Sequence, residues 1–294
     1  MNRGRSRSRR KFGCNKLSTD APSSLSSGGI LCSEWSRAVS LSSPNGAWSA
    51  LSDTEIARYV TGLTLADAQE FSELADAAFL GREGPGSMAE TALSVFVRDL
   101  YIERRSIGNS VSTLDRWAQD PSLSRDDAYG LYISLIVGSY HNLVRAIAQT
   151  VRRLGLGQRF TGRSSVNFVT ETLRIDPSLT LLHRRATRRV KIDDLQVDRG
   201  EYVELSLVAA NVDPAVFEDP ARFTLNRKTR PITFGISTHQ CAGLSQALRL
   251  CDMVARITHA SYEVELIGDC QRANPPASSP GAINSQLARI FRRG

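Results

Sequence analysis

The stretch FGISTHQCAG, residues 234–243, places one cysteine between a glycine-containing loop and the start of a predicted helix. Backbone N–H groups and the helix dipole at a helix N-terminus stabilise negative charge, so this position favours a thiolate at Cys241. Gly243 lets the backbone come close to the sulfur. A thiolate held in this way can ligate a metal or act as a nucleophile, with His239 as its base. Taken by itself, a lone cysteine is more often a buried packing residue.

The other cysteines and histidines form no metal-binding pattern. The five cysteines stand at positions 14, 32, 241, 251 and 270 without a CxxC pair, and the four histidines form no HExxH pair. A zinc site, a histidine-cluster metal site and a disulfide scaffold are therefore not indicated. Reduced thiols and a cytoplasmic location are the default expectation.

Three further motifs precede the cysteine loop in the chain. Glu171 and Arg174 have the i, i+3 spacing that puts both side chains on one face of a helix. Arg184 begins the segment RRAT, and Arg222 lies in the segment DPARF. An ExxR pair by itself is equally consistent with a solvent-exposed ion pair.

Taken together and in this order, the four motifs resemble those of the cytochrome P450 family: ExxR, RxAT, PxRF and the loop FGxGxHxCxG. The resemblance implies haem b (iron protoporphyrin IX) as the cofactor, with Cys241 as the axial ligand of the iron. It also implies that Phe234 packs near the thiolate side of the haem and that Gly243 belongs to the same loop. His239 and Arg184 are expected to contact haem propionates.

The resemblance further implies a buried ion network beneath the cysteine loop. In this network Arg222 would close a contact with the pair Glu171 and Arg174. The segment 178–182 would border the substrate. Ser237 stands where the family's loop has its second glycine, and a serine is strained there if the position requires a positive φ.

The long helix predicted around Gly138 is similar to the family's helix across the distal face of the haem. That helix usually carries Ala/Gly-Gly-x-Asp/Glu-Thr, whereas this chain has VGSYH at residues 137–141. Tyr140 and His141 thus replace the acid and the alcohol that normally help to deliver protons. We expect Tyr140, His141 or Asn142 to organise water and protons instead. The alternative is that they are ordinary packing or substrate-lining residues.

Hydrophobic periodicity predicts a mainly α-helical fold with a minor β-sheet. The last long helix should open at Cys241 and bury Leu244, Leu248, Cys251 and Ala255. A turn at residues 198–200 is expected to join two strands. One predicted helix begins at Ser52, and the others cover residues 65–80, the region of 93–101, 124–153 and 164–175. The predicted strands cover residues 190–192, 202–207 and 262–267.

Composition divides the chain into a leader, residues 1–50, and a body, residues 51–294. Residues 1–11 contain six Arg and Lys residues and no acid, so they contribute +6 of the net charge of +7 and leave +1 for the rest. We expect the leader, rich in Arg, Ser and Gly, to be disordered. A transit peptide, a nucleic-acid-binding arm and a misassigned gene start remain alternatives. Nucleic-acid binding ranks low because no aromatic residues are interleaved among the arginines.

The resemblance covers the body, residues 51–294, without a counterpart of the family's first helices and sheet. The expected fold is therefore an N-terminally truncated cytochrome P450. No apolar run approaches the roughly 18 residues that cross a bilayer. The expected function is a haem-thiolate monooxygenase that inserts one O2-derived oxygen atom into a small organic substrate. A ferredoxin or flavodoxin-type donor with its reductase would supply electrons. The alternative is a catalytically impaired relic, or a non-enzymatic haem-binding or interaction fragment.

Overall fold

The computed structural model describes residues 10–11, 58, 62–80, 88–106, 113–272 and 284–292. The helix expected to open at Ser52, and the leader apart from residues 10–11, lie outside these ranges. The described part is mainly helical with three small sheets, as the sequence predicts. Its helices are α3 (Leu65–Leu80), α4 (Met88–Ser106), α5 (Thr113–Gln119), α6 (Arg125–Gly155), η2 (Gly162–Ser164), α7 (Ser165–Ile175), α8 (Leu207–Asn211), η3 (Ser237–His239) and α9 (Leu244–Ser261).

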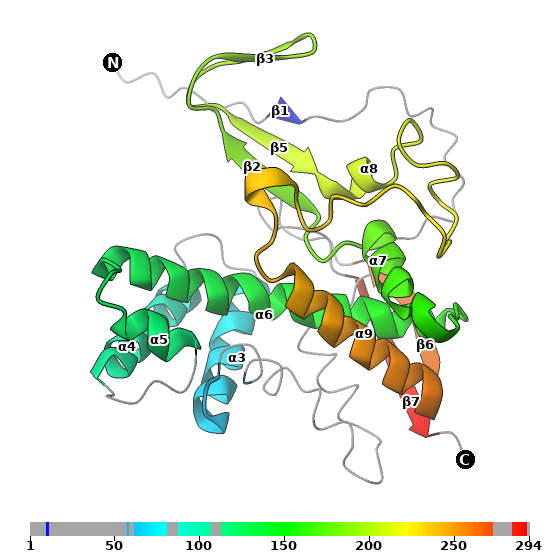
Figure 1. Cartoon of the computed structure of the whole chain (residues 1–294), viewed down its shortest axis with the longest axis horizontal. Coiled ribbons are helices and arrows are strands. Elements are labelled where there is room, and N and C mark those ends of the chain that lie inside the picture. Colours follow the sequence, from blue (N-terminus) through cyan, green and yellow to red (C-terminus); the bar gives the residue numbers. More distant parts are fainter. Residues whose placement is uncertain are drawn as a thin grey trace.

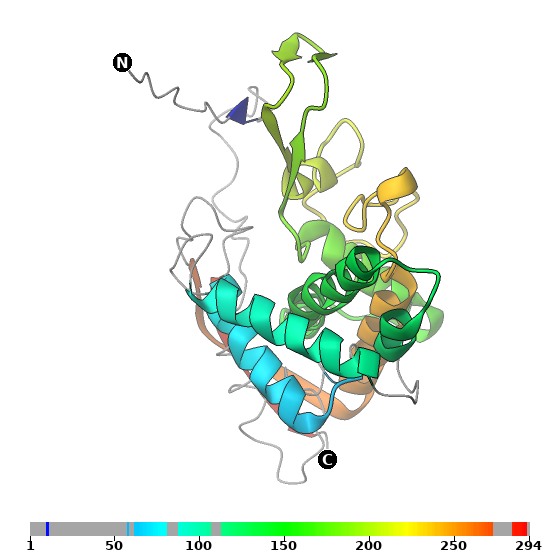
Figure 2. The ribbon, with the colours of Figure 1, turned by 90° about the vertical axis from the view of Figure 1, so that its left-hand side faces the viewer.

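Helix α6 is the centre of the molecule. Ser124 caps its N-terminus, because the serine Oγ accepts a hydrogen bond from the backbone N–H of Asp127 at 3.1 Å. Figures 1 and 2 show α3, α4 and α5 on one side of α6, and strands β2 (Leu181–Arg185) and β5 (Tyr202–Ser206) with the η3 segment on the other. Its 31 residues are therefore long enough to contact two different layers.

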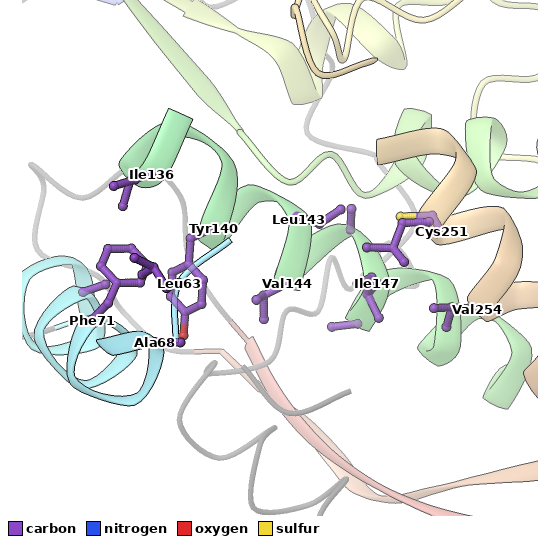
Figure 3. Close-up of a cluster of buried hydrophobic side chains, with 14 of the residues drawn as sticks. Leu63, Ala68, Phe71, Ile136, Tyr140, Leu143, Val144, Ile147, Cys251 and Val254 are labelled. Carbon is purple, nitrogen blue, oxygen red and sulfur yellow. The ribbon is translucent and has the colours of Figure 1, made fainter. Parts of the chain in front are cut away.

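The hydrophobic core lies along the side of α6 that faces α3 and α9. Figure 3 shows Tyr140 pointing from α6 toward Phe71 and Ala68 of α3. Farther along α6, the core continues to Cys251 and Val254 of α9. The buried residues of α6 repeat every three or four positions, which is the period of an amphipathic helix. This stripe consists of Ala128, Tyr132, Ile136, Tyr140, Leu143, Val144, Ile147 and Val151, and the second half of α6 also buries Ala146, Ala148, Thr150, Arg152 and Leu154.

The strands form three separate sheets. Strand β5 (Tyr202–Ser206) pairs antiparallel with β2 (Leu181–Arg185), from Leu181 opposite Ser206 to Arg185 opposite Tyr202. On its other edge β5 pairs in parallel with β1 (Arg10–Lys11). Strands β6 (Tyr262–Arg272) and β7 (Asn284–Arg292) form a long antiparallel pair at the end of the chain.

The strand pairing expected from the sequence is wrong in one place. Strand β3 (Val190–Ile192) pairs with β4 (Leu195–Val197) and not with β5. The tighter turn at Asp193, whose φ is 50°, closes this short hairpin. The predicted turn near Gly200 does form, with φ of 89°, but it leads from the hairpin back into β5. Strands β2, β4 and β7 were not predicted from the sequence. The sequence of β2, LLHRR, does not alternate between apolar and polar residues.

Candidate functional site

The cysteine loop folds back on itself and ends where α9 begins. The backbone N–H of Cys241 donates to Phe234 O at 2.7 Å, which joins the two ends of the loop. Leu244 opens α9 and donates to Cys241 O at 3.2 Å, so the cysteine stands immediately before the helix. Its side chain is exposed. A Cβ added at Gly243 would lie 3.8 Å from Cys241 Sγ, which is an ordinary contact.

Gly235 determines the path of this loop. Its φ is +71°, in the left-handed region, and a Cβ there would lie 2.6 Å from the carbonyl oxygen of His239. A larger residue would therefore meet both backbone strain and a steric clash. The loop conformation thus depends on a glycine at this position.

Ser237 also has a positive φ, of 54°, in the same loop. Left-handed backbone is strained for a serine and free of strain for a glycine. We therefore expect Ser237→Gly to stabilise the protein. Relief of the backbone strain contributes about 0.5–1 kcal/mol, and the greater chain entropy of glycine in the unfolded state reduces this gain. Urea unfolding measures this difference. Ser245→Gly, a change at an exposed position in the first turn of α9, should destabilise and is the matched control.

The loop is attached to the end of α7 through Asn211 and Thr233. Thr233 Oγ1 donates to Leu173 O at 2.9 Å and accepts from Asn211 Nδ2 at 2.9 Å. Asn211 Oδ1 accepts from the backbone N–H of Ile232 at 2.9 Å. The buried Asn211 side chain thereby fixes the residues that lead into Phe234. Neither residue is predicted from the sequence, because their partners are distant along the chain.

Beneath this attachment lies a buried ion pair on α7. Arg174 Nε and Nη2 donate to the two carboxylate oxygens of Glu171 at 2.8 and 2.9 Å. Arg174 is 0% exposed and its Nη1 donates to Asn211 O at 2.8 Å. Because the two residues are i, i+3 on one helix, the fork of the guanidinium meets the carboxylate in bidentate geometry. The pair therefore joins α7 to the residues that hold the cysteine loop.

The third residue of this network is Arg227, whereas the family motif in the sequence predicts Arg222. Arg227 Nε donates to Glu171 Oε1 at 2.8 Å, and its other nitrogens donate to Glu218 O, Asp219 O and Arg222 O. The chain from 218 to 222 curls around this guanidinium and presents three carbonyl oxygens to it. Arg222 contributes its carbonyl oxygen, while its side chain is exposed.

The residues expected on the distal side of α6 separate onto two faces. Tyr140 is 0% exposed and its ring contacts Phe71 edge-on, with centroids 5.1 Å apart. The Nε2 of His141 lies 3.2 Å from Ala75 O, so both rings are directed toward α3. Tyr140 therefore belongs to the core, and its hydroxyl does not reach the face that carries Gly138.

The largely buried side chain of His141 makes the stability of the fold depend on pH. Burial, with a smaller contribution from Arg145, lowers the pKa of His141 to about 4. An unfolded histidine titrates near pH 6.5, so acid favours the unfolded chain between about pH 6.5 and pH 4. We expect the free energy of unfolding to fall by about 2 kcal/mol from pH 7 to pH 5 on account of His141. His141→Gln should flatten that slope in urea unfolding; an equal slope in the variant contradicts this assignment.

Gly138 and Asn142 lie on the opposite face of α6. Asn142 Nδ2 donates to Gly138 O at 2.8 Å, and nothing lies within 4 Å of a Cβ position at Gly138. The i, i+4 spacing places both on one face, and Arg145 follows at i+7. Arg145 reaches the segment that leads to β2, because its Nη1 donates to Ser178 O at 2.8 Å. This face therefore looks toward β2 and not toward α3.

The side chains around Cys241 fit a haem. Residues 236–243 are all exposed, and Ile236 keeps 63% of its surface exposed in the same loop as Cys241. Phe234 is partly buried and packs against the core. Arg184 and His239 are exposed, so a basic side chain of each is accessible to an anionic group. Among the described residues, no three His, Cys, Asp or Glu side chains gather to hold a metal ion. A single thiolate suffices where a porphyrin supplies the other ligands.

The motifs and the fold agree with those of known proteins. A family model for Cytochrome P450 matches residues 166–247, the segment that carries all four motifs. Cytochrome P450 119 of Sulfolobus acidocaldarius is 26% identical over 189 residues, which are 63% of this chain and 51% of that protein. Putative cytochrome P450 140 of Mycobacterium tuberculosis is 42% identical over 83 residues, 28% of this chain and 19% of that protein.

Solved structures share the fold. CYP108D1 from Novosphingobium aromaticivorans superposes with a TM-score of 0.67 at 21% identity, covering 83% of this chain and 62% of that one. P450BioI in complex with an acyl carrier protein gives a TM-score of 0.67 at 20% identity, over 82% of this chain and 66% of that one. The architecture is that of a cytochrome P450. Over residues 166–247 the chain matches the cytochrome P450 family model, and its curated relatives and structural neighbours are bacterial and archaeal cytochromes P450.

The chain spans about half of the length of cytochrome P450 119. Across the residues that the structure describes, no helix combines the length and apolarity that a bilayer span requires.

Proposed function

We propose that this chain binds haem b through the thiolate of Cys241 and acts as a monooxygenase on a small organic substrate. The observation that carries the proposal is the placement of Cys241, which stands exposed at the start of α9 in a self-closed loop. When bound, the haem supplies the activation of O2, which its thiolate ligand favours by donating electron density.

The residues around Cys241 hold the sulfur and its surroundings in place. The bond from Cys241 N to Phe234 O and the positive φ of Gly235 fix the loop before any ligand binds. A rigid first ligand needs no reordering on binding, which improves affinity. We assign contacts with the two propionates to His239 and Arg184, whose exposed side chains carry or can carry positive charge.

The face of α6 with Gly138 supplies the opposite wall. Gly138 has no side chain and open space before it, which allows a flat ring to approach the helix. Asn142 is oriented by its bond to Gly138 O, so its Oδ1 remains the acceptor on that face. His141 Nε2 must carry a proton to donate to Ala75 O, which leaves Nδ1 as an acceptor in the neutral ring. We assign the holding and orientation of protons and water on this face to Asn142, because the ring of His141 is directed toward α3.

One observation favours a second candidate, a haem-binding protein with impaired catalysis. Tyr140 and His141 occupy the positions at which the family usually has an acid and an alcohol, and both contact α3. Such a protein would bind haem through Cys241 without efficient turnover. Electrons for the leading function would come from a ferredoxin or flavodoxin-type donor with its reductase.

The test is the carbon monoxide spectrum of the reduced protein. The chain is expressed with a supply of haem precursor, reduced, and exposed to carbon monoxide while the Soret band is recorded. A strongly red-shifted band, typical of thiolate-ligated haem, supports ligation by Cys241. A band typical of a neutral ligand, or no bound haem, contradicts it. Substrate oxidation with a surrogate ferredoxin and its reductase then separates the monooxygenase from the impaired haem protein.

A further inference from the structure

Three arginines of α6 converge on the short segment between α7 and β2. Arg145 Nη1 donates to Ser178 O at 2.8 Å. Arg152 Nη1 lies 3.7 Å from Asp176 Oδ2, and Arg153 Nη2 donates to the same carboxylate oxygen. Along an α-helix, the spacing i, i+7 and i+8 brings all three to one side. We call this set the arginine clamp.

The arginine clamp contacts the segment between α7 and β2, residues 176–180, whose two ends are held by backbone hydrogen bonds. Asp176 caps α7 through its backbone N–H, which donates to Thr172 O at 2.9 Å, and Pro177 has no N–H to donate. At the other end, Thr180 O accepts from Leu207 N at 2.9 Å, just before β2 begins. The position of the intervening residues therefore depends on the side chains of α6.

The charged side chains of the arginine clamp are buried and therefore shielded from water. The side chains of Arg152, Arg153 and Asp176 are each about one-tenth exposed or less. Arg153 also lies over the ring of Phe223, with Cζ 5.2 Å from its centroid, so part of its charge faces an aromatic surface. Buried charge-assisted bonds such as these are not weakened much by salt and hold a fixed geometry.

The clamp is continuous with the face of α6 that carries Gly138. Arg145 follows Asn142 by three residues, about 4.5 Å along the helix axis. The segment 178–182, which it holds through Ser178, leads into β2. Arg145 is the clamp residue nearest to Gly138 along the helix, and its bond to Ser178 O joins segment 178–182 to this face of α6.

We propose that Arg145 is a specificity-determining positioning residue, which fixes segment 178–182 above the Gly138 face and so sets the size of ligand that fits there. This inference rests on the proposed function, because it places the ligand between α6 and β2. Arg145 acts through Ser178 and is not assigned any contact with the reacting atoms.

The test compares two nitrogenous probes on the haem-loaded full chain. Imidazole is small and reports on access to the iron, whereas 4-phenylimidazole is larger and, under this proposal, would also contact segment 178–182. In Arg145→Met, we expect the dissociation constant of 4-phenylimidazole to change by about tenfold, the equivalent of one lost charge-assisted hydrogen bond, and that of imidazole to stay within about twofold. Arg125→Met, at an exposed position in the first turn of α6, should change neither constant.

Amide hydrogen exchange tests the clamp without any ligand. Exchange at residues 179–182 should become about tenfold faster in Arg145→Met than in the parent chain or in Arg125→Met. If the methionine variant does not fold, Arg145→Gln, which is neutral and too short to replace the guanidinium, decides by the same two measurements.

An unchanged ratio of the two probe constants together with unchanged exchange overturns the proposal. Faster exchange with an unchanged ratio retains the clamp as structure but overturns its role in ligand size. Loss of the thiolate-type spectrum in the parent chain contradicts the proposed function instead. In that case exchange in the haem-free chain still tests whether Arg145 holds the segment.

Discussion

Cys241→Ala is expected to remove the red-shifted carbon monoxide band completely, whereas Cys251→Ala should leave its position unchanged. The two cysteines lie ten residues apart, at the entrance and in the interior of the same helix. Cys241 is exposed immediately before α9, and the proposed function assigns its sulfur to the iron. Burial raises the pKa of Cys251 to about 12, so that sulfur remains a thiol at neutral pH.

Comparing the two variants separates an effect on haem ligation from an effect on the stability of the fold. Cys251 packs in the core, so its truncation to alanine removes buried volume and should destabilise by about 1 kcal/mol. Cys241 contributes no core packing, and its truncation should leave the urea midpoint of the haem-free chain nearly unchanged. Haem content and the spectrum are measured alongside. A red-shifted band that survives in Cys241→Ala, or one that disappears equally in both variants, contradicts the assignment of Cys241 as the ligand.

Local signals in the sequence predicted most of the long helices, but not the short helices α5 and α8, and α9 begins at Leu244 and not at Cys241. Helix α3 covers the expected 65–80, and α6 begins after the expected cap at Ser124. These features depend on neighbours within one or two turns, such as the bond from Asp127 N to Ser124 Oγ. The strain expected at Ser237 is likewise a property of the loop backbone, and its φ is positive.

Contacts between distant residues could not be predicted in the same way. Arg227 and Glu171 are 56 residues apart, and Thr233 and Leu173 are 60 apart. A motif names residue types near a site but does not say which arginine of a loop turns inward. For Tyr140 a signal did exist, since Ile136, Tyr140 and Leu143 continue the buried stripe of α6.

Glu171→Gln is expected to destabilise the fold by about 3–5 kcal/mol, the typical effect of removing one partner from a buried ion network. The amide keeps an acceptor oxygen but loses the charge that faces Arg174 and Arg227, both of which donate to this carboxylate. Two guanidiniums would remain buried without an anion. Urea unfolding followed by circular dichroism measures the change.

An exposed ion pair provides the matched control for this variant. Arg189 Nε lies 2.7 Å from Asp198 Oδ1, as close as the buried pair, but the two side chains are 72% and 52% exposed. Asp198→Asn should therefore change stability by less than about 1 kcal/mol. Equal effects in Glu171→Gln and Asp198→Asn would contradict a special role for burial in the network beneath the cysteine loop.

Arg227→Ala and Arg222→Ala decide between the arginine that the structure encloses and the one that the family motif indicates. Removing the Arg227 guanidinium leaves Glu171 Oε1 and the carbonyls of Glu218, Asp219 and Arg222 without this donor. We expect a loss of about 2–4 kcal/mol. Arg222 takes part through its carbonyl, which an alanine retains, so its variant should stay within about 0.5 kcal/mol of the parent chain. The reverse order of stabilities would return the third position of the network to Arg222.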